Sequence, residues 1–363
     1  MYRRVLCRIN SPASAPGYAQ YLRALCQFTL LTLAAAPAFA QTYAGSAACA
    51  ACHPKQYQAQ QASAHAKALS RAADHPVRAD FPADRLFARA PSYRFRFSRG
   101  PAGFAIRLTD GTEVMDLPVE WAFGAGGQAV TFVTRASKDW YVEHFASYYR
   151  ATRAWGATPG QDAIKPRSIA EAAGVMYKIA DPKAGIAACF ECHSTGPVTF
   201  GAEGEARLTE IGVKCEACHG PSAAHVAEPA RVRPRNPKTL TAAALNEFCG
   251  KCHRPPAQSG EAIDWNYAWN VRHQPAYLAE SRCFLKSGGK LTCLTCHDPH
   301  EAAGSRKASD YNARCRSCHA VAASKPANCV DCHMPLVSPQ SPLRFSNHWI
   351  GVYANGAKLK PRR

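Results

Sequence analysis

The stretch "LTCLTCHDPH", residues 291–300, decides what kind of fold this chain can have. Two cysteines three positions apart are followed at once by a histidine, and a second histidine comes three residues later. Four soft or borderline metal ligands therefore lie within eight residues. The same Cys-x-x-Cys-His unit occurs seven times, and we number the copies I to VII in chain order. They are Cys49, Cys52, His53 (I); Cys189, Cys192, His193 (II); Cys215, Cys218, His219 (III); Cys249, Cys252, His253 (IV); Cys293, Cys296, His297 (V); Cys315, Cys318, His319 (VI); and Cys329, Cys332, His333 (VII).

Three kinds of site use a Cys-x-x-Cys unit: a disulfide, a zinc site and a covalent haem c site. Zinc ribbons and redox Cys-x-x-Cys motifs have no need of a histidine directly after the second cysteine. In a haem c site the two sulfurs bond to the porphyrin and the adjacent imidazole binds the iron as its proximal ligand. Because all seven copies carry that histidine, the sequence predicts seven covalently attached haem c groups, each with iron bound by its motif histidine.

Residues 1–40 have the composition of a secretory signal. They carry four arginines and no acidic residue, then an apolar run over 28–36 and the A-x-A sequence Ala38-Phe39-Ala40. We expect cleavage near Ala40 and a periplasmic or otherwise exported protein. An uncleaved anchor is disfavoured, because the run is shorter than the roughly 20 residues that span a bilayer. We expect no integral membrane segment once the signal is removed.

Seven histidines lie outside the motifs, which is one for each iron. A second axial histidine closes an iron and suits electron transfer, whereas an iron without one can bind a small molecule. His75 precedes a proline in a polar stretch and His144 is flanked by aromatic residues, so structural roles compete with ligation at both positions. One or two irons could therefore lack a distal histidine. The predicted distal ligands are His65, His225, His273, His300 and His348.

One cysteine, Cys283, lies outside both the motifs and the signal region. Its apolar neighbour Phe284 favours a buried, inert thiol. A free reactive thiol, an intermolecular partner and an iron ligand remain as alternatives.

The spacing of the motifs predicts the architecture. Motif I stands alone, while the other six crowd into residues 189–333, too few residues per haem to build a separate protein core around each. We therefore predict a mostly α and irregular fold, with short helices and loops wrapped around a stack of seven haems. Between motifs I and II, alternating apolar and polar residues at 92–98, 104–109, 112–118 and 128–135 predict a small antiparallel sheet without haem.

These patterns divide the chain into five expected segments. They are a signal peptide (1–40), a first haem segment with a helix (41–90), a haemless β-containing insertion (91–165), a six-haem module (166–340) and a C-terminal segment with a candidate distal histidine and a basic tail (341–363).

The chain is basic, with a formal charge of +18. Nucleic-acid binding is disfavoured, because an exported chain meets little nucleic acid and no recognition motif is present. The two propionates of each haem would take up much of the excess Lys and Arg. The expected partners are a redox protein donor, with a quinol-linked donor as one option, and a redox protein acceptor. The basic end "GAKLKPRR" could steer an acidic partner, and an oligomer is left open.

Several stretches resemble multihaem cytochromes of the cytochrome c-554 type. The start, "YAGSAACAACHPKQYQAQQASAHAKAL", has an isolated first motif followed by a helix with Ser-x-His-x-x-Ala, here Ser63, His65 and Ala68. "FGAGGQAVTFVTR", "VKCEACHGPSAAHV", "SRCFLKSGGKLTCLTCHDPH" and "CVDCHMP" are similar as well. Some of these relatives carry tetratricopeptide repeats, and this sequence contains none. The resemblance implies a periplasmic electron carrier with several bis-histidine haems. It also implies distal-ligand roles for His65, His225 and His300.

Three functions remain open at this point. An electron carrier is favoured, because an iron with two histidines has no position left for a substrate. The alternative is an oxidoreductase that acts on a small nitrogen or sulfur compound at one haem without a distal histidine. A third hypothesis is a conducting filament built by end-to-end stacking.

Overall fold

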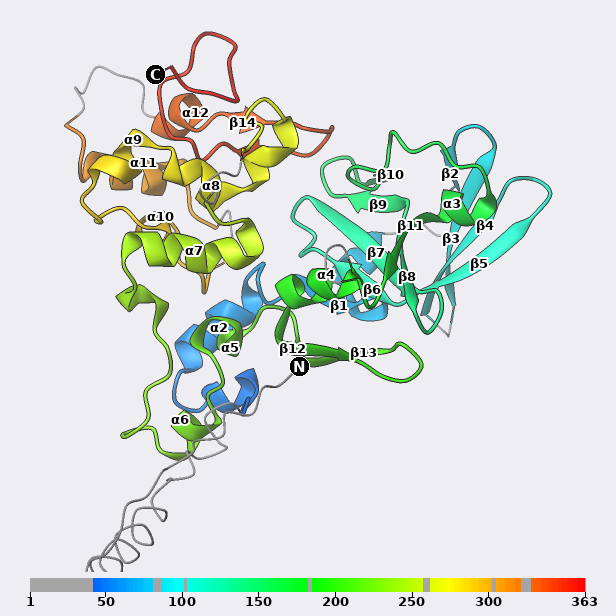
Figure 1. Ribbon diagram of the computed structural model, residues 1–363, viewed down its shortest axis with the longest axis horizontal. Coiled ribbons are helices and arrows are strands. Elements are labelled where there is room, and N and C mark those ends of the chain that lie inside the picture. The colour runs from blue at the N-terminus through cyan, green and yellow to red at the C-terminus, as the bar shows by residue number, and fades with distance from the viewer. Residues whose placement is uncertain are drawn as a thin grey trace, which may run out of the picture. The chain divides into compact units, whose positions relative to one another are not determined.

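Helices and strands occupy different parts of the chain in the computed structural model (Figure 1). The structure describes residues 42–80, 86–100, 103–181, 185–256, 262–301, 305–320 and 328–362. The predicted signal peptide and its cleavage site lie outside the described residues. None of the helices within the described ranges has the length and apolar composition needed to cross a bilayer.

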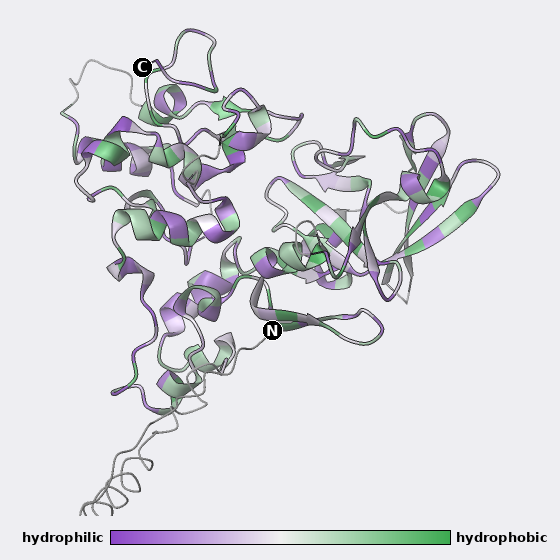
Figure 2. Ribbon diagram, in the orientation of Figure 1, coloured by the Kyte–Doolittle hydropathy of each residue, from purple (hydrophilic) through white to green (hydrophobic). Residues whose placement is uncertain are grey.

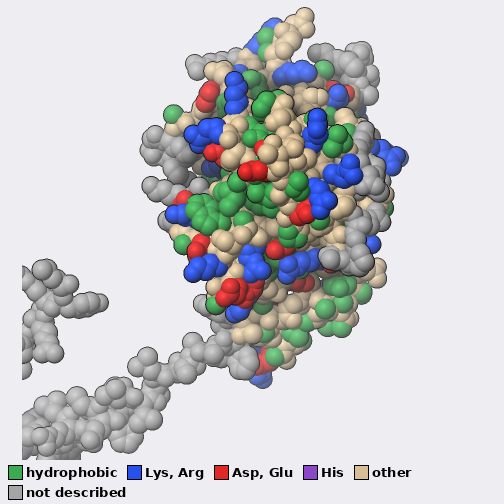
Figure 3. All heavy atoms as spheres, turned by 90° about the vertical axis from the view of Figure 1, so that its right-hand side faces the viewer, with side chains coloured by type: hydrophobic (Ala, Val, Ile, Leu, Met, Phe, Trp, Pro, Cys, Tyr) green, Lys and Arg blue, Asp and Glu red, His purple; other side chains and the backbone are tan. Residues whose placement is uncertain are grey.

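The predicted β region begins with a four-stranded antiparallel sheet of order β2-β3-β4-β5. Residues alternate between its two faces, as the sequence pattern requires: Phe95, Ile106 and Leu108 are fully buried, while Arg94 and Arg96 are exposed. Figure 3 views the molecule from the side on which these strands lie in Figure 1. The strands are β2 (Leu86–Arg89), β3 (Tyr93–Gly100), β4 (Gly103–Thr109) and β5 (Val114–Val119).

A second, seven-stranded sheet follows the order β1-β6-β7-β8-β11, with β9 paired to β7 and β10 paired to β9. Its fully buried side chains include Trp121, Phe132, Tyr141 and Tyr148, so large aromatic residues supply most of its core. The strands are β1 (Leu69–Arg71), β6 (Trp121–Phe123), β7 (Ala129–Arg135), β8 (Trp140–His144), β9 (Ala146–Tyr149), β10 (Ala154–Ala157) and β11 (Gly174–Lys178).

The prediction of a mostly α fold with a small β insertion is wrong. Two further hairpins, β12 (Ser194–Phe200) with β13 (Ala206–Ile211) and β14 (Leu336–Val337) with β15 (Phe345–Ser346), bring the described part of the chain to four sheets. The four strands read from the sequence are confirmed as β3, β4, β5 and β7. The missed strands are mostly short or follow no alternation, and several pair with distant segments, as β1 does with β6.

Every motif lies on or beside a short helix. Motif I follows a 3-10 helix, η2 (Ser46–Cys49), and precedes α2 (Pro54–Ala62). Motifs II to VII lie on or next to α4 (Ile186–His193), α5 (Cys215–His219), α7 (Ala242–His253), α10 (Cys293–Cys296), α11 (Ala308–Arg316) and α12 (Cys329–His333). The remaining helices are η3 (Ala72–Asp74), η4 (Pro76–Asp80), α3 (Ile169–Ala173), α6 (Ala223–Ala227), η5 (Pro237–Thr239), η6 (Ala268–Arg272), α8 (Gln274–Ala279) and α9 (Arg282–Lys286).

Protein side chains supply little apolar interior to the helical region. The two large hydrophobic clusters belong mainly to the sheets, and the cluster around α8 contains only three buried residues, Val271, Tyr277 and Val337. Polar and apolar residues stand side by side along the helices (Figure 2). A segment of this kind is expected where a large apolar cofactor forms part of the core.

Candidate haem-binding sites

The motif cysteines are available to bond to a cofactor. All fifteen cysteines in the described part of the chain are free, and fourteen of them belong to the motifs. Within the same residues, no group of three or more His, Cys, Asp or Glu side chains is placed to hold a bare metal ion. A structural zinc site needs four such ligands together. The disulfide and zinc alternatives therefore find no support in the described residues.

Four motif histidines each lie opposite one of the predicted distal histidines. Two imidazoles on opposite sides of one metal ion have ring centroids about 6.2 Å apart, from metal–nitrogen bonds of about 2 Å and about 1.1 Å from each nitrogen to its ring centre. The observed centroid separations match this spacing, so the residues present fit an iron between each pair. The pairs are His53–His225 at 6.4 Å, His253–His65 at 6.0 Å, His219–His300 at 6.3 Å and His297–His348 at 6.2 Å.

Hydrogen bonds at Nδ1 set the orientation of many of these rings. An acceptor at Nδ1 fixes the proton there and leaves Nε2 for a metal. The acceptors are mostly backbone carbonyls, which sequence reasoning did not find. The Nδ1 contacts are His193 to Ala68 O (2.9 Å), His219 to Arg235 O (2.8 Å), His225 to Val232 O (2.7 Å), His333 to Gly351 O (2.9 Å), His348 to Ser346 O (3.0 Å) and His65 to Pro299 O (3.4 Å).

His300 differs from the others because its Nδ1 partner is a carboxylate. Asp298 Oδ1 lies 2.9 Å from His300 Nδ1 and also accepts the His300 backbone N–H at 2.9 Å. This short Asx turn is encoded in "CHDPH", where an aspartate stands two residues before the histidine. A carboxylate partner raises the basicity of a ligating imidazole. The sequence contained the signal for Asp298, although we did not predict its role.

Desolvation favours the neutral form of five candidate ligands. Removal from water lowers the pKa of His193, His219, His253 and His297. It lowers the pKa of His348 further, to about 4. The neutral imidazole is the form that binds a metal.

The segment that carries His65 is a turn. The sequence predicts a helix through Ser63 and His65, which is correct for Pro54–Ala62 and wrong beyond it. The Ser63 hydroxyl accepts the Ala66 N–H at 3.1 Å, which satisfies a backbone donor that a continuing helix would use. Val213 N–H donates to His65 O at 2.9 Å. Beside it, Gly212 has φ +83°, and a Cβ there would lie 2.1 Å from Ala66 O, so this approach requires glycine.

A buried carboxylate joins motif I to motif III. Glu216, which is 2% exposed, accepts the backbone N–H groups of Ala44 (2.9 Å), Gly45 (2.8 Å) and Ser222 (2.7 Å). It stands inside motif III, between Cys215 and Cys218, so the chain before motif I is held directly on the motif III helix. The sequence gives no signal for this role, because two of the three donors, Ala44 and Gly45, lie on distant backbone.

Contacts between cysteines of different motifs give the order in which the motifs adjoin. Thiol contacts join motifs I and III, II and IV, IV and V, and VI and VII. Electrostatic contacts between thiols join III with IV and V with VI. The motifs therefore form one line, I-III-IV-V-VI-VII, with motif II as a branch at motif IV. Cys283 is half-buried beside cysteines of motifs V and VI, and burial raises the pKa of its thiol.

The other histidines have different surroundings. His75 Nε2 lies 2.9 Å from Gly124 O, and its Nδ1 accepts the Val77 N–H at 3.1 Å, so both ring nitrogens are bonded to backbone. His144 is fully buried in β8 with Nε2 2.7 Å from Thr134 Oγ1, and burial lowers its pKa to about 3. His273 stands between η6 and α8. Ligation by His273 stays a prediction.

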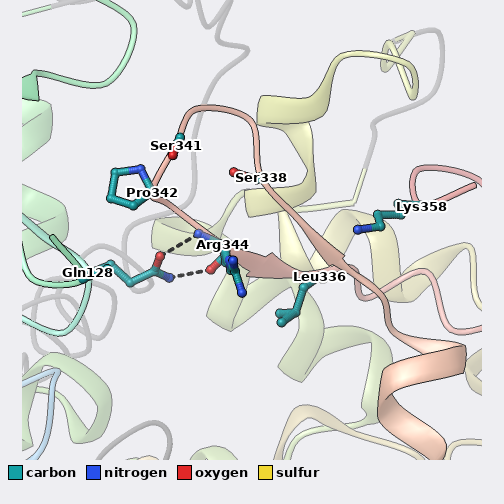
Figure 4. Close-up of a pocket in the computed structure, with 8 residues that line it drawn as sticks. Gln128, Leu336, Ser338, Ser341, Pro342, Arg344 and Lys358 are labelled. Carbon is teal, nitrogen blue, oxygen red and sulfur yellow. Dashed lines mark hydrogen bonds between the residues drawn. The ribbon is translucent and has the colours of Figure 1, made fainter. Parts of the chain in front are cut away.

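A cavity of about 780 Å³ lies where the C-terminal segment meets the β region. Gln128 fixes one wall, since its side chain donates to Arg344 O at 2.7 Å and accepts the Arg344 N–H at 2.8 Å (Figure 4). Arg344, Lys358 and Leu336 also line the cavity, and no predicted iron ligand does. Its contacts hold the C-terminal segment on the β region.

Comparison with known proteins connects these sites with a family. The family model "Cytochrome c554 and c-prime" matches residues 48–80 and 146–220, which contain motifs I, II and III together with His65. The multiheme cytochrome MtrA of Shewanella baltica (strain OS185) is 26% identical over 42% of this chain and 46% of its own length. This chain is a multihaem c-type cytochrome. Cytochromes of this type bind haem c covalently through cysteine pairs.

Two solved structures resemble the cytochrome in fold. The crystal structure of the outer cell wall cytochrome OcwA has a TM-score of 0.50 at 14% identity, covering 85% of this chain and 79% of that one. The undecaheme cytochrome from the S-layer of Carboxydothermus ferrireducens has a TM-score of 0.43 at 18% identity, covering 85% of this chain and 47% of that one. The cytochrome spans less than half the length of its curated relative MtrA.

Proposed function

We propose that this cytochrome is an exported electron carrier that holds seven haem c groups and exchanges electrons with redox protein partners. One observation carries the proposal. The ring centroids of four motif histidines lie 6.0 to 6.4 Å from the ring centroid of a second histidine, which is the separation that two imidazoles on one metal ion require. When bound, haem c with two axial histidines supplies one-electron redox chemistry without a position for substrate. The fourteen motif cysteines would attach the haems, and the seven motif histidines would be proximal ligands.

The assigned distal ligands follow from the pairs. We assign His225 to the iron of motif I, His300 to that of motif III, His65 to that of motif IV and His348 to that of motif V. Each distal histidine comes from a different segment than its proximal partner, so each pair also joins two parts of the chain. The order I-III-IV-V-VI-VII supports a continuous path with motif I at one end and motif VII at the other.

The location and partners form part of the same proposal. Haem c is attached outside the cytoplasm, and residues 1–40 have the composition of a secretory signal, which supports a periplasmic or otherwise exported protein. OcwA is named for the outer cell wall, which agrees with export by analogy. The donor, quinol-linked or not, and the acceptor would meet the chain near motifs I and VII.

Spectroscopy of the purified holoprotein tests the proposal. The intact mass should exceed that of the signal-free chain by seven haem groups. Low-temperature EPR of the oxidised protein should show that at least four haems are low-spin. Carbon monoxide added to the reduced form should bind to a minority of the haems. A protein in which most haems are high-spin and bind carbon monoxide would contradict the proposal.

A second function is favoured by the surroundings of motif II. The ring that lies against His193 is that of Phe123, at 5.2 Å between ring centroids, and burial lowers the pKa of His193. Glu143 lies beside motif II and accepts hydrogen bonds from Gln161 Nε2 at 2.9 Å and Tyr177 Oη at 3.4 Å. Arg272, whose pKa is lowered by burial, is in electrostatic contact with both His193 and Glu143. This cluster suits a small nitrogen or sulfur oxyanion.

We therefore propose, as the alternative function, that motif II is the site of an oxidoreductase. Binding is measured first: nitrite should perturb the spectrum of one haem in the oxidised protein. Arg272→Gln should weaken nitrite binding while carbon monoxide still binds that haem after reduction. If neither ligand perturbs any haem, the alternative fails and the electron carrier remains.

A further inference from the structure

The exposed face of the β2–β5 sheet carries three arginines in adjacent positions. Arg94 and Arg96 belong to β3 and Arg107 to β4, and all three side chains are exposed. The register places Arg96 directly opposite Arg107, with Arg94 two residues along the same face. We call these three residues the arginine face. It does not depend on the haem sites, and no predicted ligand belongs to it.

The charges on this face are not balanced. Arg107 binds Asp116 on β5 through both ends of its guanidinium, with Nε and Nη2 each 2.7 Å from a carboxylate oxygen. Arg94 and Arg96 form no ion pair in the described structure. Like charges directly opposite each other on neighbouring strands destabilise a sheet. Asp116 compensates Arg107 within the sheet, so Arg94 and Arg96 are the two charges on this face that an external carboxylate would neutralise.

The surroundings of the arginine face are those of a protein interface. Leu86 on β2 is 54% exposed and pairs across the strands with Arg96. Val114 on β5 is 62% exposed and pairs with Thr109, which in turn pairs with Arg94. Arginine is enriched at protein interfaces, and the two exposed aliphatic side chains add apolar area beside the arginines. Asp110, a carboxylate on the β4–β5 turn, is already engaged, because it accepts the N–H groups of Thr112 and Glu113 at 2.8 Å each.

We propose that the arginine face docks a partner protein through closely spaced carboxylates that bind Arg94 and Arg96. The Arg107–Asp116 pair shows on the same face the two-pronged geometry that such carboxylates adopt. All three cations are arginines, whose planar fork matches a carboxylate better than a lysine ammonium does. The two arginine charges that no carboxylate of the described structure pairs favour the approach of an acidic partner.

Binding of poly-L-glutamate to the full holoprotein tests this docking surface. The test variant is Arg94→Gln with Arg96→Gln. The matched control is Lys358→Gln with Lys360→Gln, which removes the same charge from the exposed basic tail. At low salt the arginine variant should bind poly-L-glutamate about tenfold more weakly than the wild type, the size expected for two exposed ion pairs. The tail variant should change the affinity by less than about threefold.

Hydrogen exchange locates the contact independently of affinity. Poly-L-glutamate should protect residues 93–109 in the wild type and leave the helices of the motifs unchanged. Equal weakening in both double variants would mean that only net charge matters and would overturn the proposal. Tighter binding to polyphosphate or to phosphatidylglycerol vesicles than to poly-L-glutamate would also overturn it, in favour of a phosphate or membrane surface. Both variants should keep seven haems and the wild-type visible spectrum, because neither pair touches a motif.

Discussion

Replacing His300 by alanine should convert one haem from a closed to an open iron. The His219 and His300 rings are nearly parallel, at 12°, and their centroids are 6.3 Å apart. Removal of His300 leaves the position opposite His219 without a protein ligand, while the Arg235 carbonyl still holds His219 through Nδ1 at 2.8 Å. One of seven haems is about 14% of the total, so about 14% of the haem should become high-spin and bind carbon monoxide.

The assay is low-temperature EPR with spin quantitation, followed by carbon monoxide titration of the reduced protein. His300→Ala should take up one more equivalent of carbon monoxide per chain than the wild type, and the intact mass should still show seven haems. The double variant His225→Ala with His300→Ala should take up two more. The matched control is His75→Ala, which removes a buried histidine bonded only to backbone and should leave the spin state unchanged. An unchanged spectrum for His300→Ala, or an equal high-spin signal in the control, would refute the axial assignment.

Three further predictions concern Glu216, His144 and Cys283. Glu216→Ala leaves three backbone N–H groups without their acceptor, so it should lower the free energy of unfolding by about 3 kcal/mol or more and lower the thermal midpoint. The control Glu228→Ala, at an exposed ion pair, should lower the free energy of unfolding by less than about 1 kcal/mol. The folded pKa of His144, about 3, lies below its ordinary value of 6.5, so its contribution to stability is complete above pH 6.5 and is lost as the pH falls towards 3. In His144→Phe the free energy of unfolding should therefore fall less steeply as the pH is lowered, by up to about 1.4 kcal/mol per pH unit, which corresponds to one proton. Denaturant titrations from pH 7 to pH 5 measure this slope, and an unchanged slope would contradict the prediction. Burial raises the pKa of Cys283, so iodoacetamide should alkylate it at pH 8 more slowly than a free peptide thiol, and Cys283→Ser should keep all seven haems. Rapid alkylation of Cys283, read by mass spectrometry, would count against a protected thiol.

The sheets show where sequence reasoning ended. Alternation over six to eight residues was enough to find β3, β4, β5 and β7. Alternate positions are buried in β3 and β4 and half-buried in β5, and β7 keeps this alternation in its first half. β9 is buried at all four positions and β1 has only three residues, so neither has a readable period. β1 takes its hydrogen bonds from β6, far away in the sequence, and β9 takes part of its own from β7, and local patterns do not contain that information. The predicted segment boundaries stay predictions.

The sequence by itself determined the chemistry of this protein. The repeated Cys-x-x-Cys-His units indicate covalent haem c, because attachment and proximal ligation need residues at fixed short spacing on one turn of backbone. Only the tertiary structure decided which histidine lies opposite which. His65 meets His253, and His348 meets His297, over separations that no local rule predicts. The same holds for the carbonyls that fix each ring and for the thiol contacts that order the motifs. Distal positions are filled from distant segments, since a chain cannot place a second imidazole across an iron from the turn that supplies the first.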